Sequence, residues 1–369
     1  MNKGRVSRVL MTADTVGGVW TFSLELASAL ADHDVEVVLA ALGGFPSAEQ
    51  RSAASRVPRL QLVPSDFKLE WMDDPWNDVE ASGTWLLSLE RQFQPDVVHL
   101  NSYGHGALPW QAPVVLTAHS CVLSWWAAVK SEPLPTLWNR YQNEVACSVK
   151  SVDVLAAPSR AMLKNIEENY GVDLPPSLVI PNGRDPAVFR QGPKANLILS
   201  AGRLWDEAKN IAAVARVAPR LPWPVYVAGE NRHPNGSAAR VNGCRQLGCL
   251  PAEALAGWYA AASIYTLPAR YEPFGFSALE AALSGCALVL GDIDSLREVW
   301  DGAAVFVPPD SDSALETALS RLIANTALRQ EMARRATDRA LWFAPERMAA
   351  GYLETYRQVA SARRLTCAS

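Results

Sequence analysis

The chain has 369 residues, which is enough for two domains with separate hydrophobic cores. Its 49% hydrophobic and 20% charged residues are typical of a soluble globular protein, and a net charge of −4 without a basic run argues against a nucleic-acid partner. The first residues lead directly into a strand-like run, so we expect no signal peptide, and no apolar stretch is long enough to span a bilayer.

The cysteines and acidic pairs give no indication of a metal site. None of the six cysteines shows the C-x-x-C spacing of zinc sites, and a chain of this length does not need disulfides, so we expect a reduced, cytoplasmic protein. Asp292 and Asp294 form a D-x-D pattern. Because Ser295 and Glu298 have the spacing of a capping box, we expect these aspartates to begin a helix rather than to bind a metal.

Strand-like and helix-like runs alternate through the first half of the chain. Strands are expected at Val6–Thr12, Val35–Ala41, Leu60–Val63, Asp96–Leu100, Val114–Ala118, Asp153–Ala156 and Leu178–Pro181. Helices are expected at Val19–Leu30, Gly83–Phe93, Leu134–Lys150 and Ala161–Glu168, the last capped by Ser159, and Phe67–Val79 is expected to be a loop. This alternation predicts a parallel sheet with ligands at the carboxyl ends of the strands.

The same alternation resumes after a proline-containing segment, Arg184–Ala195, which is expected to be the linker. Strands are expected at Leu197–Ala201, Val225–Ala228, Ile264–Pro268, Ala287–Leu290 and Val305–Val307. Helices are expected from Lys209 onward and at Ala252–Ala262, Ser277–Ala282, Ser313–Asn325, Leu328–Ala340 and Pro345–Ala360. The chain therefore predicts two α/β halves of similar organisation.

The stretch Arg270–Gly285 carries the clearest functional pattern. Glu272 and Glu280 stand on either side of a turn that opens into a helix of small residues, so the two carboxylates can address two ends of one long ligand. The first helical turn, entered at Gly275, offers N–H groups to an anion. The alternative is a capped core helix with two solvated glutamates.

Three further features lie at strand ends in the first half. Gly17 and Gly18 follow a strand and precede a helix, which allows a ligand close to the backbone, but the absence of G-x-G-x-x-G disfavours a nicotinamide dinucleotide. His119 follows a strand, where a hydrogen-bonded structural role is the alternative to a catalytic one. Trp125 and Trp126 form either an acceptor platform or a wedge between helices.

Together these motifs resemble those of the family GT4 retaining glycosyltransferases. The resemblance spans nearly the whole chain. Its elements are the E-x7-E motif from Glu272 to Glu280, the basic pair Arg203 and Lys209, the glycine loop Gly17-Gly18, His119, and the closing segment from Phe343 through Tyr356. A departure is the loop Glu230–Gly236, which is longer and more polar than the short glycine turn usual in the family.

The resemblance implies the GT-B fold, an α/β architecture of two Rossmann-like doubly wound parallel-sheet domains facing across a cleft. We expect an N-terminal acceptor-side domain over residues 1–183, the linker over 184–195 and a C-terminal nucleotide-sugar-binding domain over 196–344. The tail helix over 345–369 would cross back to the N-terminal domain.

The resemblance also implies roles for the motif residues. The donor diphosphate would be contacted by Arg203, Lys209, Gly17, Gly18 and Gly275. The transferred sugar would be contacted by Glu272, Phe274, Gly275, Phe276 and His119. Glu280 would bind the nucleotide ribose, and Trp125 and Trp126 would face the acceptor. His119 and Glu272 would be the catalytic residues, by positioning and charge stabilisation, and neither a metal nor another cofactor is implied.

The expected activity is that of a retaining hexosyltransferase (EC 2.4.1.-) that moves glucose from UDP-glucose to a carbohydrate or lipid-linked sugar, as in exopolysaccharide or cell-envelope glycan synthesis. A front-side mechanism is implied, in which the departing phosphate oxygen takes the acceptor proton. A UDP-sugar hydrolase, epimerase or phosphorylase, a GDP-mannose-dependent mannosyltransferase and an inactive binding protein remain alternatives. We expect membrane contact to be at most peripheral, at the inner membrane face, and favour a monomer.

Overall fold

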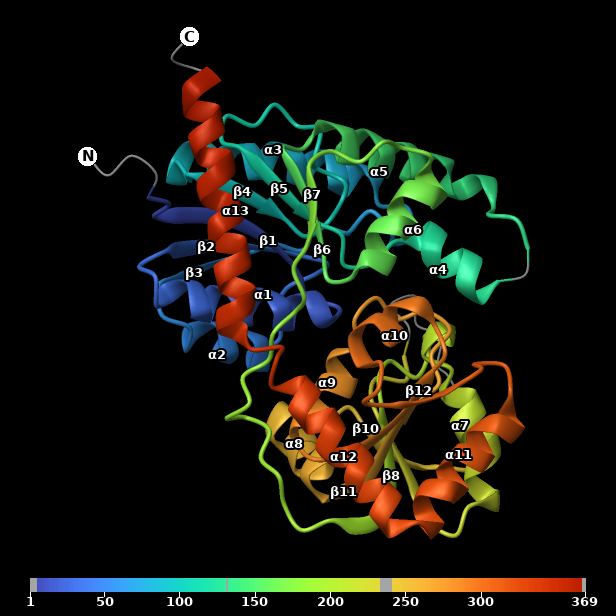
Figure 1. Cartoon of the computed structure of the whole chain (residues 1–369). Helices are drawn as coiled ribbons and strands as arrows, with labels where there is room; N and C mark the ends of the chain where they lie inside the picture. The colour runs from blue at the N-terminus through green and yellow to red at the C-terminus, as the bar shows by residue number, and fades with distance from the viewer. Residues whose placement is uncertain (1–4, 131, 233–240, 367–369) are drawn as a thin grey trace. The chain divides into compact units, whose positions relative to one another are not determined.

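The computed structural model of the protein describes residues 5–130, 132–232 and 241–366, which form two compact α/β units (Figure 1). The first unit comprises the described residues of Met1–Ser124, Glu132–Gly183 and Pro345–Ser369. The second comprises those of Trp125–Ser131 and Arg184–Ala344. The segment Trp125–Ser131 and the expected linker therefore both group with the second unit.

The first unit is built on a parallel sheet of seven strands in the order β3-β2-β1-β4-β5-β6-β7. The strands are β1 (Arg8–Asp14), β2 (Glu36–Leu42), β3 (Leu60–Pro64), β4 (Val97–Leu100), β5 (Val114–Thr117), β6 (Val154–Ala157) and β7 (Ser177–Val179). The central strands are buried on both faces, which is why they read as continuous apolar runs. The strand order reverses between β1 and β4, and ligands of open α/β sheets bind at such a point.

The helices of the first unit are α1 (Gly18–Ala31), α2 (Ala48–Ser55), α3 (Trp76–Phe93), α4 (Val122–Val129, whose second half groups with the second unit), α5 (Asn139–Ser151), α6 (Arg160–Tyr170) and α13 (Pro345–Thr366), with a 3-10 turn at Thr136–Trp138. The Ser159 cap is confirmed, because its side chain accepts from the backbone N–H of Met162. The loop expected over Phe67–Val79 was wrong in its last residues, because α3 already begins at Trp76.

The second unit has a parallel sheet of six strands in the order β10-β9-β8-β11-β12-β13. The strands are β8 (Ala195–Ala201), β9 (Val225–Ala228), β10 (Arg245–Gly248), β11 (Ala262–Leu267), β12 (Ala287–Gly291) and β13 (Val305–Val307). The helices are α7 (Ile211–Val217), α8 (Ala252–Ala261), α9 (Phe276–Leu283), α10 (Asp294–Trp300), α11 (Asp312–Ala324) and α12 (Thr326–Ala340), with 3-10 turns at Glu207–Lys209 and Ala218–Arg220. Here the order reverses between β8 and β11, so the turns after these strands are the expected ligand positions.

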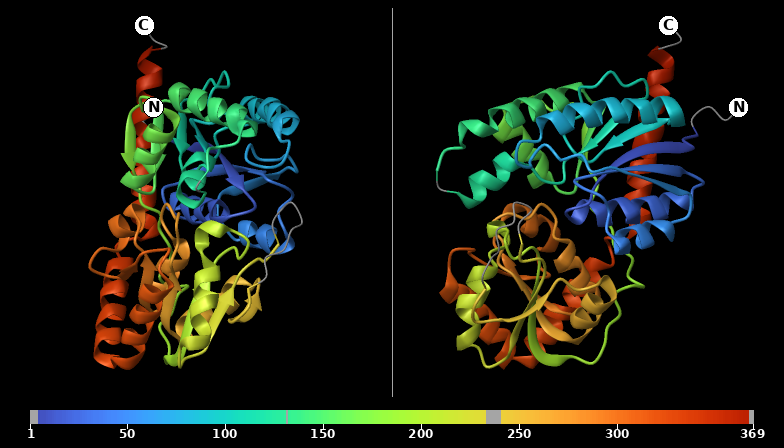
Figure 2. Two further views of the ribbon diagram at one scale, coloured as in Figure 1. Left: turned by 90° about the vertical axis from the view of Figure 1, so that its right-hand side faces the viewer. Right: turned by 180° about the vertical axis from the view of Figure 1, so that it is seen from behind.

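The last helix, α13, packs against α1 and β4 of the first unit, and Figures 1 and 2 show it beside that sheet from three sides. Its Tyr352 and Tyr356 are fully buried. The Tyr352 hydroxyl lies 3.0 Å from Thr117 Oγ1, and the Tyr356 hydroxyl lies 2.6 Å from Nδ1 of His99. The helix is thus held by hydrogen bonds inside the core as well as by apolar contact.

Within the described residues, no helix combines the length and apolar character needed to cross a membrane.

Candidate functional site

The turn between β11 and α9 holds the helix start expected to receive an anion. Gly275 is the N-cap of α9 and has φ 93° and ψ 66°, a left-handed conformation that favours glycine. No side chain caps this end of the helix, so its first N–H groups are available to a ligand. Phe274 is 2% exposed and packs edge-on against Phe276 and Phe343, which fixes the turn on the hydrophobic core.

Glu272 stands just before this turn and forms an ion pair with Lys209. The Nζ of Lys209 lies 2.6 Å from Oε2 of Glu272, and the two side chains are only 15% and 13% exposed. The hydroxyl of Ser295 donates to the backbone carbonyl of Glu272 at 2.6 Å. The capping box predicted at Ser295 was wrong, because α10 begins at Asp294 with Ile293 as N-cap. Ser295 supports the acidic turn instead, a partner that sequence reasoning missed.

Lys209 is presented by a tight turn rather than by a helix. It ends the 3-10 turn Glu207–Lys209, and Asn210 follows in the left-handed conformation with φ 55°, so the expected helix starts only at Ile211. The buried Asn210 amide donates to the carbonyls of Pro268 at 2.9 Å and Pro309 at 2.7 Å. These bonds fix the backbone that carries Lys209 against the turn after β11.

Arg203 has a buried carboxylate as its partner. Its Nη2 lies 2.9 Å from Oδ2 of Asp206, whose side chain is 4% exposed. The other oxygen, Oδ1, accepts from the Trp125 indole N–H at 2.9 Å. Burial acts to raise the pKa of Asp206, but the charges of Lys209 and Arg203 and the hydrogen bond from Trp125 outweigh it and hold the pKa below its ordinary value. Asp206 is a second partner that the sequence motifs did not indicate.

Glu280 lies inside α9 and is also paired. It is 9% exposed, and its Oε1 lies 2.8 Å from Nε of Arg184. Arg184 belongs to the segment expected to be only a linker, and its guanidinium also stacks over the Phe189 ring at 4.9 Å. Glu272 and Glu280 are therefore not solvated, as the alternative interpretation had it, because each carboxylate is largely buried beside a cation.

In the first unit, the glycine loop lies between β1 and α1. Gly17 is the N-cap of α1 in an extended conformation, no side chain caps this helix end, and Gly18 is the first helical residue. The preceding Asp14 accepts from the backbone N–H of Val16 at 2.6 Å, which shapes the loop. Gln50 of α2 donates to the Thr15 carbonyl at 2.9 Å. The loop thus offers backbone N–H groups at the point where the strand order reverses.

His119 follows β5 and contacts residues from two other elements. Its Nε2 lies 2.8 Å from Oδ1 of Asn101, and its ring meets the Phe22 ring edge-on with centroids 4.4 Å apart. Although the residue keeps some exposed surface, the surrounding protein desolvates the ring and lowers the pKa of His119 to about 3. The ring is therefore neutral at neutral pH. Asn101 is a third partner that sequence reasoning missed.

The tryptophan pair does not form one flat surface. The Trp125 and Trp126 rings are tilted by 56° with centroids 6.2 Å apart, and Lys130 lies 5.7 Å from the Trp125 ring centroid. Lys130 also pairs with Glu207 at 2.7 Å, beside the Trp125 contact to Asp206. The acceptor role of the pair stays a prediction, and Trp125 has the additional role of holding the loop that carries Arg203.

The polar loop after β9 is described only in part. Gly229 has φ 145°, and a Cβ atom there would lie 1.7 Å from the Gly202 carbonyl oxygen, so only glycine allows this approach. The N–H of Leu204 donates to the Glu230 carbonyl at 2.8 Å, which supports the loop that carries Arg203. Residues 233–236, part of the predicted departure from the family pattern, lie outside the described residues.

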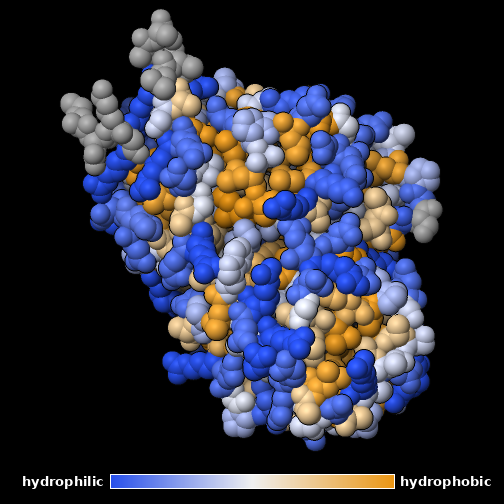
Figure 3. Space-filling view, in the orientation of Figure 1, coloured by the Kyte–Doolittle hydropathy of each residue, from blue (hydrophilic) through white to orange (hydrophobic). Residues whose placement is uncertain are grey.

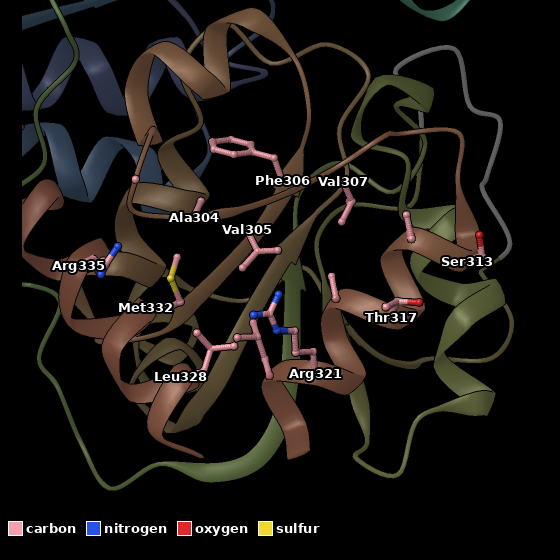
Figure 4. Close-up of a pocket in the computed structure, with 14 residues that line it drawn as sticks. Ala304, Val305, Phe306, Val307, Ser313, Thr317, Arg321, Leu328, Met332 and Arg335 are labelled. Carbon is pink, nitrogen blue, oxygen red and sulfur yellow. The ribbon is translucent and has the colours of Figure 1, made fainter. Parts of the chain in front are cut away.

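A pocket of about 630 Å³ lies elsewhere on the second unit, between the edge strand β13 and helices α11 and α12 (Figure 4). Val305, Leu328 and Met332 are among its apolar lining residues, and Figure 3 shows apolar surface gathered over this face. None of its described lining residues belongs to the expected donor site. The charged residues of the expected donor site lie instead at the turns after β8 and β11.

Two stretches of the chain, one after the other, match known protein families. Residues 16–188 match the family described as Glycosyltransferase Family 4, and residues 195–325 match Glycosyl transferases group 1. Glycogen synthase of Mycobacterium tuberculosis is 28% identical over 363 residues, a match that covers 88% of this chain and 86% of that protein.

Solved structures share the whole architecture. Sucrose-phosphate synthase from Thermosynechococcus elongatus superposes with a TM-score of 0.81 at 18% identity over 96% of this chain and 100% of that chain. Anabaena HepE in complex with UDP-glucose gives a TM-score of 0.74 at 14% identity over 94% of this chain and 98% of that chain. At such identities these similarities establish the fold alone.

The fold and the motif residues define a glycosyltransferase built on two Rossmann-like parallel-sheet domains, the GT-B architecture. The matches to Glycosyltransferase Family 4 over residues 16–188 and to Glycosyl transferases group 1 over residues 195–325 confirm the resemblance to GT4-type glycosyltransferases and the expected fold class.

Proposed function

We propose that the protein is a retaining hexosyltransferase that transfers glucose from UDP-glucose to a carbohydrate or glycolipid acceptor. The observation that carries this proposal is the cluster in the second unit, where Lys209 contacts Glu272 beside the uncapped start of α9 and Arg203 is held by Asp206. Cations and helix N–H groups suit a diphosphate, and a carboxylate beside them suits the hydroxyls of the attached sugar.

The chemistry of the transfer matches these groups. As the bond from the anomeric carbon to the phosphate oxygen breaks, negative charge grows on the diphosphate and positive charge on the sugar ring. Arg203, Lys209 and the N–H groups at Gly275 stabilise the first charge, and Glu272 lies beside the second. The departing phosphate oxygen takes the proton of the acceptor hydroxyl on the same face, which retains the anomeric configuration. In this proposal the cationic side chains supply the charge stabilisation, and no metal is required.

The remaining assignments follow from the same donor. Gly17 and Gly18 are assigned to the diphosphate, since their helix start is uncapped. His119 is assigned to the sugar, and Glu280 to the ribose with Arg184 as its charge partner. UDP-glucose is the donor we favour because the HepE structure is a complex with UDP-glucose. An acceptor in exopolysaccharide or cell-envelope glycan synthesis fits this proposal, with Trp125 and Trp126 on the acceptor side.

The test is a thermal-unfolding screen over UDP- and GDP-sugars, followed by mass analysis and proton NMR of the products formed with simple glycoside acceptors. We expect UDP-glucose to raise the unfolding temperature, because a ligand at 100 times its Kd stabilises the folded state by about 2.7 kcal/mol. The product should be a glucoside whose anomeric configuration matches that of the donor. Inverted product would contradict the retaining mechanism.

Other outcomes distinguish the alternatives. Release of free glucose, or an epimerised donor, without any acceptor would indicate a UDP-sugar hydrolase or epimerase on the same fold. Transfer from GDP-mannose but not from UDP-glucose would identify GDP-mannose as the donor. Stabilisation by UDP without transfer to any acceptor would indicate a binding protein. Lys209→Met should lower the rate of transfer about 10²–10³-fold. Lys150→Met should leave the rate unchanged, because Lys150 is exposed on α5 of the other unit.

A further inference from the structure

Thr12 of β1, Asn101 just after β4 and His119 just after β5 form a hydrogen-bonded chain in the first unit. The backbone N–H of Asn101 donates to Thr12 Oγ1 at 2.8 Å, and Nδ2 of Asn101 donates to the Thr12 carbonyl at 2.7 Å. Oδ1 of Asn101 lies 2.8 Å from Nε2 of His119. Thr12 is 1% exposed and Asn101 is 8% exposed, so water cannot easily replace these contacts.

The directions of these bonds are fixed by the chemistry of the groups. A backbone carbonyl only accepts, so the side-chain atom of Asn101 that faces Thr12 must be its NH₂ group. The atom that faces His119 is then the carbonyl oxygen, which also only accepts. Nε2 of His119 must therefore carry the proton. In a neutral imidazole the other nitrogen, Nδ1, is then an acceptor with a free lone pair.

The surroundings of the ring favour its neutral form. Phe22 of α1 covers one side of His119 and brings no charge. His99 of β4 is the nearby titratable group, and burial together with the neighbouring His119 holds its pKa well below the ordinary value. Its two ring nitrogens are bonded to Tyr356 and Thr117. Burial lowers the pKa of His119 to about 3. The structure provides no carboxylate bond to Nε2 that would stabilise an imidazolium, since its partner is an uncharged amide.

We propose that Asn101 is a positioning residue that holds His119 in the Nε2–H tautomer, so that Nδ1 accepts a hydrogen bond from a hydroxyl group of the transferred sugar. This inference rests on the proposed function and deepens it. An acceptor-only nitrogen selects a hydroxyl and disfavours a carboxylate or an ether oxygen at the same place, because those groups have no proton to donate. Asn101 thus contributes to sugar specificity without contacting the sugar.

The first experiment measures the tautomer directly in the full-length protein. With histidine labelled by ¹⁵N in its ring, long-range proton–nitrogen NMR spectra separate the five histidines, and His119→Gln identifies the signal of His119 by its loss. We expect a protonated Nε2 and an unprotonated Nδ1 at pH 7 and at pH 5. A protonated Nδ1 in the neutral ring, or a charged ring at pH 6, overturns the inference. This measurement needs no activity and no altered Asn101.

The second experiment changes the partner to a carboxylate. In Asn101→Asp the opposite charge should raise the pKa of His119 by about 1 to 3 pH units, as for other close charge pairs. Below the new pKa, Nδ1 carries a proton and cannot accept, so transfer should fall about tenfold for each further pH unit. Asn139→Asp adds the same charge at an exposed position of the same unit and should keep the wild-type pH profile.

The two readouts separate this inference from the proposed function. If the enzyme transfers sugar while His119 is Nδ1-protonated, or if the pH profile of Asn101→Asp matches that of the wild type, the inference is wrong and the proposed function stands. If the Nε2–H tautomer is observed but no nucleotide sugar is consumed or bound, the sugar contact and the proposed function both fail, and only the positioning of the ring by Asn101 remains supported.

Discussion

Lys209 and Glu272, 63 residues apart in the chain, form an ion pair with 2.6 Å between Nζ and Oε2. In the proposed function these residues serve opposite parts of one donor, the diphosphate and the sugar. The cation and the carboxylate thus stabilise each other and stand side by side where the sugar–phosphate bond would lie. In the proposed function a bound donor would share Lys209 with Glu272, which would couple recognition of the phosphate to the orientation of the carboxylate.

The first prediction uses this pair. Lys209→Met leaves the Glu272 carboxylate without its cation, and loss of one partner of a buried pair costs about 3–5 kcal/mol of unfolding free energy. Glu272→Gln should cost less, because Gln keeps a hydrogen-bonding oxygen beside Lys209. Each single variant should lose about 10²–10³-fold in kcat, as when one donor to a developing anion is removed. Urea unfolding and initial rates with UDP-glucose measure both effects.

The double variant separates stability from catalysis. Lys209→Met with Glu272→Gln removes both charges and should recover most of the lost stability, because no uncompensated charge remains in the site. It should not recover transfer, since neither the phosphate cation nor the sugar carboxylate is present. If the double variant regained activity together with stability, the pair would be a structural ion pair and not part of the donor site.

The second prediction concerns the start of α9. Gly275→Ala places a side chain on a residue with φ 93°, which costs about 1–2 kcal/mol of unfolding free energy. A Cβ there would make only ordinary contacts, at 3.4 Å from Leu296 and 3.5 Å from Glu272, so the strain comes from the positive φ and not from crowding. Relief of this strain requires the backbone to adjust. Because that adjustment turns the first N–H groups of the helix, transfer should fall by at least about tenfold, equivalent to roughly 1.4 kcal/mol at the transition state.

Gly171→Ala is the matched control for this backbone effect. Gly171 ends α6 with φ 58°, and nothing lies within 4 Å of a Cβ built there. We expect a similar loss of stability in denaturant unfolding but an unchanged kcat/KM for UDP-glucose. Equal losses of activity in both variants would show that the effect of Gly275→Ala is one of general stability.

The third prediction is a pH dependence of stability set by a buried histidine. His105 is 2% exposed, and burial lowers its pKa to about 4, against which the hydrogen bond to the Val79 carbonyl acts only partly. The folded pKa is below the ordinary 6.5, so the unfolded chain takes up the proton first as the pH falls. Stability is fully present above pH 6.5 and is lost progressively down to about pH 4, by roughly 3 kcal/mol in total.

The pKa values of His99 and His119 are lowered as well, so both residues contribute to the same pH dependence. The quantity to compare between variants is therefore the slope of unfolding free energy against pH, and not the absolute stability. His105→Gln should reduce the slope of unfolding free energy against pH between 6.5 and 4 by about one proton, or roughly 1.4 kcal/mol per pH unit. His33→Gln, at an exposed position, should leave the slope unchanged. An unaltered slope in His105→Gln would mean that His105 is not held neutral by the fold.

The apolar runs of the sequence predicted the sheet well, because parallel strands covered on both faces must be apolar throughout. The run Ala287–Leu290, for example, is β12 (Ala287–Gly291). Helix α2 and strand β10 were missed for the opposite reason. Both are short and mostly polar, with little buried surface, so their residues carry no periodic signal.

The site was predictable where it is local in sequence and not where the fold brings distant residues together. The acidic turn around Glu272 and Gly275 is recognisable within a few residues. Its partners are not, because Arg184 reaches Glu280 across 96 residues and Ser295 reaches Glu272 across 23. Asn101 and His119 follow different strands, and only the adjacency of β4 and β5 places them in contact. No pattern of spacing contains such pairings.

The final prediction separates two roles of Trp125, the proposed acceptor contact and the hydrogen bond to Asp206. Trp125→Phe keeps an aromatic ring but removes the N–H that lies 2.9 Å from Asp206 Oδ1. Since Asp206 also holds Arg203 at 2.9 Å, losing this bond should loosen the diphosphate contact and raise KM for UDP-glucose. Asp206→Asn should have a larger effect of the same kind, because it removes the charge that pairs with Arg203. Initial rates with each substrate varied in turn measure this. If Trp125→Phe changes only the acceptor KM, then Trp125 acts solely as an acceptor contact and Asp206 positions Arg203 without it.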